Sequence, residues 1–263
     1  MQSNPLMEAF GNAKTLRNDN SSRFGKFIKV LLDKGHHITG GSITNYLLEK
    51  PRIVTQPADE RNYHIFYQLL RGLPDADRTA VGLRPAPADA IDDFHYLNQS
   101  GCDSLDGVDD AEELVVTANA MDMIGMSPDE KFAVFRLLAG LLHLGNVTFT
   151  ADPEEGAFVA PGPSREALTR AGTTLALDAA GFEKSLLTRR VKSPQAVYFS
   201  PMTVAQSQHA RDAATKAVYG RMFDWLVQRI NKTIDAPVRH MHGEQLPWLA
   251  LIHLPNAHTL RRC

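Results

Sequence analysis

Five polar side chains that could hold a phosphate and its metal ion lie within six residues, from Asn18 to Arg23. Ser21 and Ser22 offer hydroxyl oxygens, which are hard ligands of the kind that magnesium accepts beside water and phosphate oxygens. Asn18 and Asn20 carry amides that can donate hydrogen bonds to phosphate oxygens. The planar guanidinium of Arg23 can bind a carboxylate from elsewhere in the chain. Together these groups are suited to closing over the terminal phosphate of a magnesium nucleotide.

The same octapeptide, residues 18–25, also has a simpler interpretation. Asn and Ser favour turns because their side chains bond to the neighbouring backbone, and an apolar run from Phe27 to Leu32 follows. Taken alone, a short polar stretch of this kind is more often a turn before a strand than a binding site. The sequence on both sides of the octapeptide favours the binding site instead.

Segments on both sides of the octapeptide are similar to those of one known family. These segments are residues 4–15, 24–28, 46–50, 60–70, 94–101, 141–146, 211–213 and 221–227. They follow the family's order and resemble the motor domain of myosin heavy chains, at and beyond the loop called switch I, over about residues 3–235. A kinesin-like motor also offers an Asn-x-x-Ser-Ser-Arg loop, but Phe-Gly-Lys-Phe at 24–27 and Tyr-Leu-Leu-Glu-Lys at 46–50 favour myosin.

The resemblance implies a role for four residues of the octapeptide. Asn18 and Ser21 would contact phosphate, and Ser22 would ligate Mg²⁺. Arg23 would form an ion pair with a glutamate of a second loop, switch II. Ser21 and Arg23 would therefore take part in catalysis, and all four residues would bind the ATP and Mg²⁺ of the intact motor.

Two other parts of a nucleotide site are not found among these residues. The printed sequence has no Gly-x-x-x-x-Gly-Lys-[Ser/Thr], the loop that cradles phosphates. The hexapeptide Asp-Ala-Ala-Gly-Phe-Glu at 178–183 fits the switch II pattern letter by letter, but it precedes the Phe-Asp-Trp-Leu-Val helix that switch II should follow. Residues 171–177 before it also have a helical pattern rather than that of a strand. We therefore expect this chain, taken alone, to lack ATPase activity.

Basic side chains begin a second candidate surface. Arg189, Arg190 and Lys192 open a segment that we expect to be a loop up to about residue 202, and its position resembles the actin-facing cardiomyopathy loop of myosin. Basic groups in such a loop can meet acidic actin, although a solvated loop explains them equally well. Ala196 and Val197 stand where some classes carry a regulatory acidic or phosphorylated residue.

Sequence patterns predict a mainly α fold with a small β-sheet remnant, as in a piece of the α/β, P-loop NTPase-type myosin motor. The expected elements are a hairpin over 24–48 turning at residues 33–35, a helix over 59–71, a connector over 73–92, a helix over 164–176 and a further segment over 181–187. Ser127 and Thr203 begin capping boxes for two further helices, and the second helix would run to residue 235 with Trp225 in its core. Loops are expected over 150–164 and 193–201, and the two-stranded hairpin would leave edges that favour aggregation.

The resemblance divides the chain into a partial motor domain, 1–235, and a tail, 236–263, that has lost the resemblance. The domain comprises switch I and the hairpin (1–50), the helical upper 50-kDa region (51–202) and the long helix (203–235). The tail carries Leu-Pro-Trp-Leu-Ala-Leu-Ile-His-Leu-Pro at 246–255, and a shifted frame or retained intron would explain it. His240 and His242 suggest a metal, but a solvated tail is the better interpretation because no carboxylate or Cys has ligand spacing.

Composition narrows the class of protein further. The formal charge of −2 offers no electrostatic case for nucleic acid or an acidic membrane. No stretch approaches the length of a membrane span, and two distant cysteines, Cys102 and Cys263, fit a reduced, cytoplasmic protein. We expect an actin-based motor piece at the cytoskeleton, with actin and ATP as partners, no coiled coil and no light chains. The alternative is a non-catalytic helical module with residual actin binding.

Overall fold

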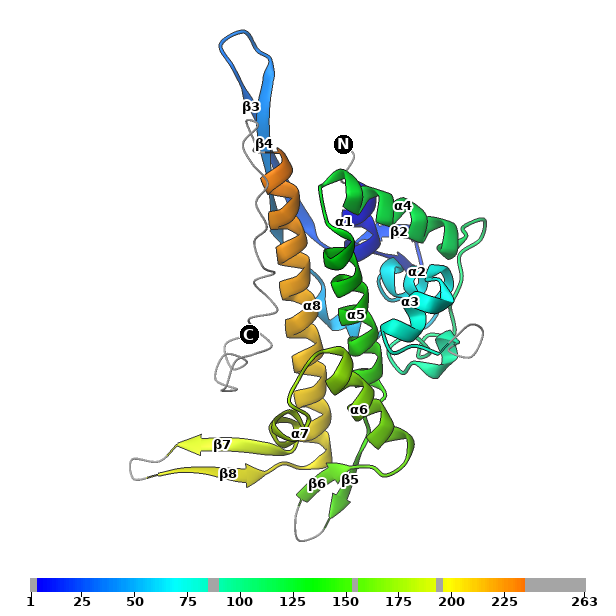
Figure 1. The fold of residues 1–263 in the computed structure, drawn as a ribbon, viewed down its shortest axis with the longest axis vertical. Helices are drawn as coiled ribbons and strands as arrows, with labels where there is room; N and C mark the ends of the chain where they lie inside the picture. Colours follow the sequence, from blue (N-terminus) through cyan, green and yellow to red (C-terminus); the bar gives the residue numbers. More distant parts are fainter. Residues whose placement is uncertain (1–3, 85–89, 153–155, 193–195, 235–263) are drawn as a thin grey trace.

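A computed structural model describes residues 4–84, 90–152, 156–192 and 196–234. One long helix, α8 (Val204–Ile234), runs along the molecule, and α5 (Pro128–Gly145) lies beside it (Figure 1). At 1.5 Å per residue, the 31 residues of α8 span about 46 Å. Buried side chains occur on several sides of α8, as the sequence pattern predicts, and Trp225 is among them.

Shorter helices surround this pair. They are α1 (Asn4–Gly11), α2 (His64–Gly72), α3 (Asp75–Ala80), α4 (Asp110–Met123), α6 (Pro163–Thr174) and α7 (Ala179–Leu187), with 3-10 turns at Lys50–Ile53 and Ile91–Asp93. In Figure 1, α1 to α4 lie on one side of α5, and α6 and α7 lie toward its lower end. The expected mainly helical body is confirmed.

The described strands form four antiparallel pairs. They are β1 (Asn12–Thr15) with β2 (Asn18–Ser22), β3 (Gly25–Leu32) with β4 (Ile38–Tyr46), β5 (Phe149–Asp152) with β6 (Gly156–Val159), and β7 (Thr188–Lys192) with β8 (Val197–Pro201). The β3–β4 hairpin extends beyond the end of α8, while β5–β6 and β7–β8 lie at the opposite end of the molecule (Figure 1). Small antiparallel sheets therefore border the helical body.

Aromatic side chains join the first helices to α8. The ring of Tyr219 stacks on Tyr63 at 5.3 Å and on Phe66 at 5.4 Å between centroids. The Tyr219 hydroxyl donates to the Phe10 carbonyl at 2.9 Å, which satisfies a fully buried polar group. This cluster fixes α1 and α2 against α8. It thereby also positions β1, which directly follows α1.

Both capping boxes are confirmed. Ser127 Oγ accepts from the Glu130 backbone N–H at 3.1 Å, and the Glu130 carboxylate accepts from the Ser127 N–H at 2.8 Å. Thr203 and Gln206 make the same reciprocal pair at 3.3 and 3.0 Å, where α8 begins. Each pair satisfies two backbone donors that have no partner inside the helix.

The helices differ from expectation mostly at their ends. The helix expected over 59–71 begins only at His64. Asp59 has a φ of 63°, the Arg61 N–H donates to the Lys14 carbonyl at 3.1 Å, and Tyr63 is bridged to Ala13, so residues 59–63 are not helical. Helix α4 and the short α3 were not predicted, since α3 lies in the Pro- and Asp-rich connector and α4 has no apolar face of clear helical period. Helix α7 begins at Ala179, capped by Asp178, whose side chain accepts from the Gly181 N–H at 2.7 Å. That cap supports the rejection of residues 178–183 as a switch loop.

The loops expected over 150–164 and 193–201 are wrong in part. The first contains most of β5 and all of β6, and the second contains β8, which pairs with β7. The hairpin expected over 24–48 is confirmed, but its positive φ falls on His36, at 64°, and not on Gly35. Asp33 Oδ1 holds this turn by accepting from the backbone N–H groups of Gly35 and His37 at 2.7 and 2.9 Å. None of the described helices is both long and apolar enough to cross a bilayer.

Candidate functional site

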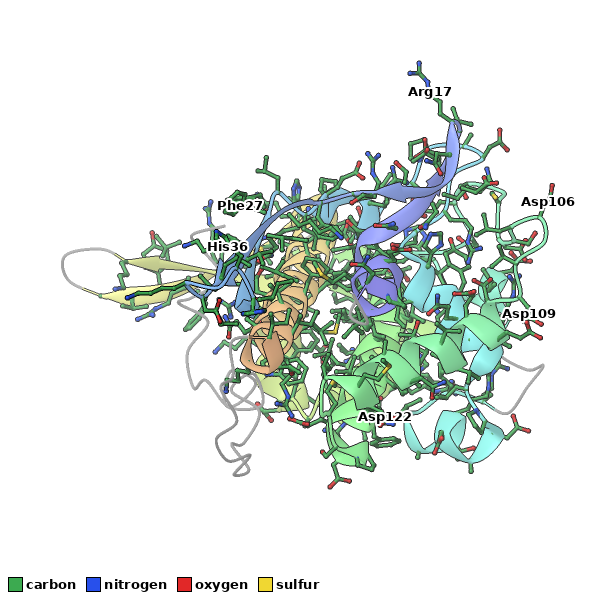
Figure 2. All side chains as sticks on the ribbon, turned by 90° about the horizontal axis from the view of Figure 1, so that it is seen from above. Arg17, Phe27, His36, Asp106, Asp109 and Asp122 are labelled. Atoms are coloured by element: carbon green, nitrogen blue, oxygen red, sulfur yellow. The ribbon has the colours of Figure 1, made fainter. Side chains whose placement is uncertain are left out.

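The octapeptide lies on an exposed strand rather than in a free loop. Strand β2 pairs with β1 so that Ser21 is opposite Ala13 and Ser22 is opposite Asn12. The tip of this pair reaches into solvent, where Arg17 points away from the body (Figure 2). Ser22 is exposed and Arg23 is half-buried, so neither lies in a packed core. This is the exposure that a phosphate-binding segment requires.

The candidate side chains do not all bind one another. The β1–β2 register shifts between Ala13 and Thr15, so strand alternation is interrupted between Ser21 and Asn18. Arg23 Nη1 donates to Ser21 Oγ at 3.3 Å, so these two side chains meet. Asn18 Oδ1 instead accepts from the Asn20 N–H at 2.8 Å, and Ser22 Oγ donates to the Phe24 carbonyl at 3.0 Å. The structure brings Ser21 and Arg23 together, whereas the side chains of Asn18 and Ser22 bind backbone groups of neighbouring residues.

Arg23 is bound to a carboxylate of this chain. Its Nε donates to Glu49 Oε2 at 2.6 Å, and the Arg52 Nε donates to the same oxygen at 2.7 Å. The Arg52 side chain is almost fully buried and also reaches Glu60 at 2.7 Å. The hydrogen bond that Arg23 donates to the Glu49 carboxylate raises the pKa of Arg23. Burial alone would raise the pKa of Glu49, but hydrogen bonds from Arg23 and Arg52 outweigh it and lower that pKa.

No local sequence pattern indicates this ion network or the hydrogen-bond network around Asn20. Asn20 Oδ1 accepts from Asn12 Nδ2 at 2.9 Å and lies 3.2 Å from His64 Nε2, while its Nδ2 donates to Glu8 at 3.1 Å. Glu49 and Glu60 stand in the segments that resemble the family, yet nothing in their spacing shows that they meet Arg23 and Arg52. Asn20 was noted only as one of the amides. These contacts fix the middle of β2, and the residue that follows its last position, to the helical body.

The basic residues at 189–192 lie on a hairpin and not on the expected loop. Arg190 is paired with Phe199 and Lys192 with Val197, while Arg189 is paired with Ser200. The side chains of Val197, Tyr198 and Phe199 are about half exposed, at 46%, 53% and 50%. Lys184 lies 4.2 Å above the Phe199 ring. The hairpin therefore presents basic and apolar groups together. His240 and His242 lie outside the described residues.

Comparison with known proteins identifies the family. The family model described as myosin head (motor domain) matches residues 1–244. The chain is 40% identical over 237 residues to Myosin-2 of Lachancea kluyveri, covering 90% of this chain and 15% of that protein. It is 43% identical over 235 residues to Myosin-17 of Arabidopsis thaliana, covering 89% and 15%. With Myosin heavy chain IB of Acanthamoeba castellanii the identity is 44% over 233 residues, covering 89% and 19%.

The chain thus spans less than a fifth of each of these relatives. Its match to the family model nevertheless includes every described helix and strand. The extent of that match, together with three relatives from separate lineages at 40% identity or more, shows that this chain belongs to the myosin head (motor domain) family.

Proposed function

We propose that residues 1–235 act as the switch I and upper 50-kDa part of an actin-activated Mg²⁺-ATPase motor of the P-loop NTPase type. The observation that carries this proposal is the Asn-x-x-Ser-Ser-Arg sequence on an exposed strand end, with the Arg23 guanidinium fixed by Glu49. Family membership supports it, because the parent family is a motor family. The proposed setting is the cytoskeleton in the cytoplasm, with actin and ATP as partners.

The geometry of Ser22 fits a role as a magnesium ligand. Its hydroxyl proton is directed to the Phe24 carbonyl, so the oxygen lone pairs stay available on an exposed side chain. A bound Mg²⁺ would neutralise charge on the phosphates. Asn18 and Ser21 would donate to phosphate oxygens, and Arg23 would hold the loop to a carboxylate of a second loop. Since Ser21 and Arg23 bind each other while Asn18 and Ser22 bind neighbouring backbone groups, the strand must change locally for all four to contact one nucleotide.

A chimera tests these roles. The segment matching residues 12–50 in the motor domain of Acanthamoeba myosin heavy chain IB is replaced by residues 12–50 of this chain, and actin-activated phosphate release is measured. We expect Ser22→Ala and Arg23→Ala each to lower the rate by about 100-fold, the scale for losing one group that stabilises developing charge. Arg17→Ala, on the exposed tip of the same strand pair, is the control. Equal rates for all three variants would refute the roles assigned to Ser22 and Arg23.

Residues 1–263 alone should release phosphate from ATP no faster than buffer does. A single switch segment offers few groups to a triphosphate, and the printed sequence has no phosphate-cradling loop. A rate well above that of buffer, lost on Ser22→Ala substitution, would contradict this expectation.

A second candidate function rests on the β7–β8 hairpin. Arg189, Arg190 and Lys192 alternate along β7 beside the exposed rings of Tyr198 and Phe199. Basic groups at the rim of an apolar contact speed the encounter with an acidic partner such as actin. Cosedimentation of the 263-residue chain with actin filaments, with and without ATP, tests this function. Pelleting that is independent of ATP and is lost on Arg189→Glu with Lys192→Glu would support a binding module without catalysis.

A further inference from the structure

The β7–β8 hairpin exposes apolar side chains on both of its faces. Val197 and Phe199 are two residues apart on β8 and share one face, the first face, whereas Tyr198 between them belongs to the second face. About half of each of these three side chains is exposed. The hairpin, coloured yellow, extends away from the helices (Figure 1 and Figure 2). Neither face is therefore fully covered by the described part of the chain.

Each face of the hairpin also carries a basic side chain. Lys192 is opposite Val197 in the strand pairing and so lies on the first face. The ammonium group of Lys184, from α7, is on that face too, 4.2 Å from the centre of the Phe199 ring. Arg189, three residues before Lys192 on β7, lies on the second face. Since all three basic residues are exposed, both faces present positive charge beside apolar groups.

No acidic residue of the hairpin balances these charges. The printed sequence has no Asp or Glu between Glu183 and Asp212. Glu183 already accepts from Arg165 at 2.6 Å. Asp212 likewise accepts from Arg211 at 2.8 Å. The formal charge of −2 for the whole chain therefore conceals a locally basic surface, which fits an acidic partner.

The two-sided arrangement distinguishes between acidic partners. The flat surface of a folded protein, such as an actin filament, would cover one face of a two-stranded ribbon and leave the other face in water. The headgroup region of a bilayer surrounds a ribbon on both faces, so apolar and aromatic side chains can reach the acyl boundary while basic groups bind lipid phosphates. Unpaired backbone groups along the strand edges keep such a ribbon out of the hydrocarbon interior.

We propose that the β7–β8 hairpin docks on acidic lipid surfaces, with both of its faces in the headgroup region. Val197, Tyr198 and Phe199 supply the apolar contact, and Arg189 and Lys192 bind the anionic headgroups. The contact is peripheral, since none of the described helices can span a bilayer. Docking involves no nucleotide, so its failure would leave the proposed motor function unaffected. A vesicle and an actin filament would compete for the hairpin, because both would use the same side chains.

Flotation of the full 263-residue chain with lipid vesicles tests this docking. Vesicles of phosphatidylcholine are compared with vesicles that also contain phosphatidylserine, and we expect binding only to the second kind, weakening as salt is added. Arg189→Gln and Lys192→Gln, one on each face, should each lower the binding constant about fivefold, the effect of about 1 kcal/mol per basic side chain. Tyr198→Ser and Phe199→Ser should each lower it about tenfold, because half of each ring remains to be buried.

Two substitutions in the β3–β4 hairpin are the matched controls. Tyr46 on β4 is 51% exposed, against 53% for Tyr198. Lys29 on β3 is exposed, as Lys192 is. Tyr46→Ser and Lys29→Gln therefore remove the same chemical groups from the opposite end of the molecule, and they should leave vesicle binding unchanged.

Amide hydrogen exchange of the unmutated chain keeps the test independent of these substitutions. Peptides from β7 and β8 should exchange more slowly when phosphatidylserine vesicles are present, whereas peptides from β3 and β4 should not change. Unchanged exchange in β7 and β8 would overturn the proposal even if the chain floats with the vesicles.

Three flotation results would also overturn the proposal. The first is equal binding by the hairpin variants and their controls, and the second is equal binding to vesicles with and without phosphatidylserine. The third is a loss of binding in only one of Tyr198→Ser and Phe199→Ser. That result would mean that a single face makes the contact, as expected for a protein surface such as actin.

Discussion

Removal of the Asp110 carboxylate should destabilise the fold strongly. Asp110 is almost fully buried at the start of α4, where Arg61 Nη2 donates to its two oxygens at 2.8 and 3.0 Å and Arg71 Nη1 donates at 2.7 Å. The Arg61 side chain is itself 0% exposed and its guanidinium lies 3.8 Å from the centre of the Tyr67 ring. In Asp110→Ala, therefore, Arg61 would keep a buried positive charge beside an aromatic ring without a carboxylate.

Breaking a buried ion pair from one side costs about 3–5 kcal/mol, and we expect Asp110→Ala to lower the free energy of unfolding by that amount. Asp103→Ala is the matched control, because Asp103 binds the same Arg71 at 2.9 Å but is 54% exposed. An exposed pair contributes about 0–1 kcal/mol. The loss of stability should therefore depend on whether the removed carboxylate is buried, and not on the loss of an arginine contact as such.

Urea unfolding followed by circular dichroism measures the difference. With a slope of about 1–3 kcal/mol per molar urea, Asp110→Ala should lower the midpoint by more than about 1 M, and Asp103→Ala by much less. Equal midpoints for the two variants would refute the reasoning. Such a result would mean that water or the Tyr67 ring stabilises the buried positive charge of Arg61 once the carboxylate is gone. The double variant Arg61→Leu with Asp110→Leu should recover part of the loss, because no buried charge then remains.

Three further outcomes follow from single contacts. Burial lowers the pKa of His64 from 6.5 to about 4, so the unfolded chain takes up a proton that the folded chain resists. Stability should fall between pH 6.5 and pH 4 by up to about 3 kcal/mol, and His64→Gln should flatten that part of a urea-midpoint profile against pH. Ser127→Ala should cost about 1 kcal/mol by the same urea assay, through loss of the cap on α5. Gly145→Ala should lower the thermal midpoint, because its Cβ would lie 2.5 Å from Tyr96 Cδ2.

Local signals were sufficient for α5 and α8, the helices that begin with a predicted capping box. Ser127 and Thr203 mark the beginnings of α5 and α8 because the cap involves residues only three apart. The hairpins β5–β6 and β7–β8 were missed, since their strands are four or five residues long and the segments hold Pro and Gly. Strands of that length are stabilised by their pairing partner, which no local pattern identifies.

The contacts of the candidate site depend on residues distant in sequence. The types Asn18, Ser21, Ser22 and Arg23 suggest phosphate chemistry, but the strand pairing that positions Asn18, Ser21 and Ser22 involves β1. Glu49 lies 26 residues from Arg23, and only the fold shows that they meet. Sequence could therefore suggest the chemistry of this segment and its family, but not the protein groups that already bind to it.

The position of Glu49 bears on how Arg23 could serve a second loop. Glu49 is anchored by the nearly fully buried Arg52, so it stays beside β2 whether or not Arg23 remains bound. Arg23 uses Nε for Glu49 and Nη1 for Ser21, and within the described residues its Nη2 has no protein acceptor. A guanidinium can bind two carboxylates through different edges. A carboxylate from another loop therefore needs only the Nη edge of Arg23, and the Glu49 contact would hold the guanidinium in place for it.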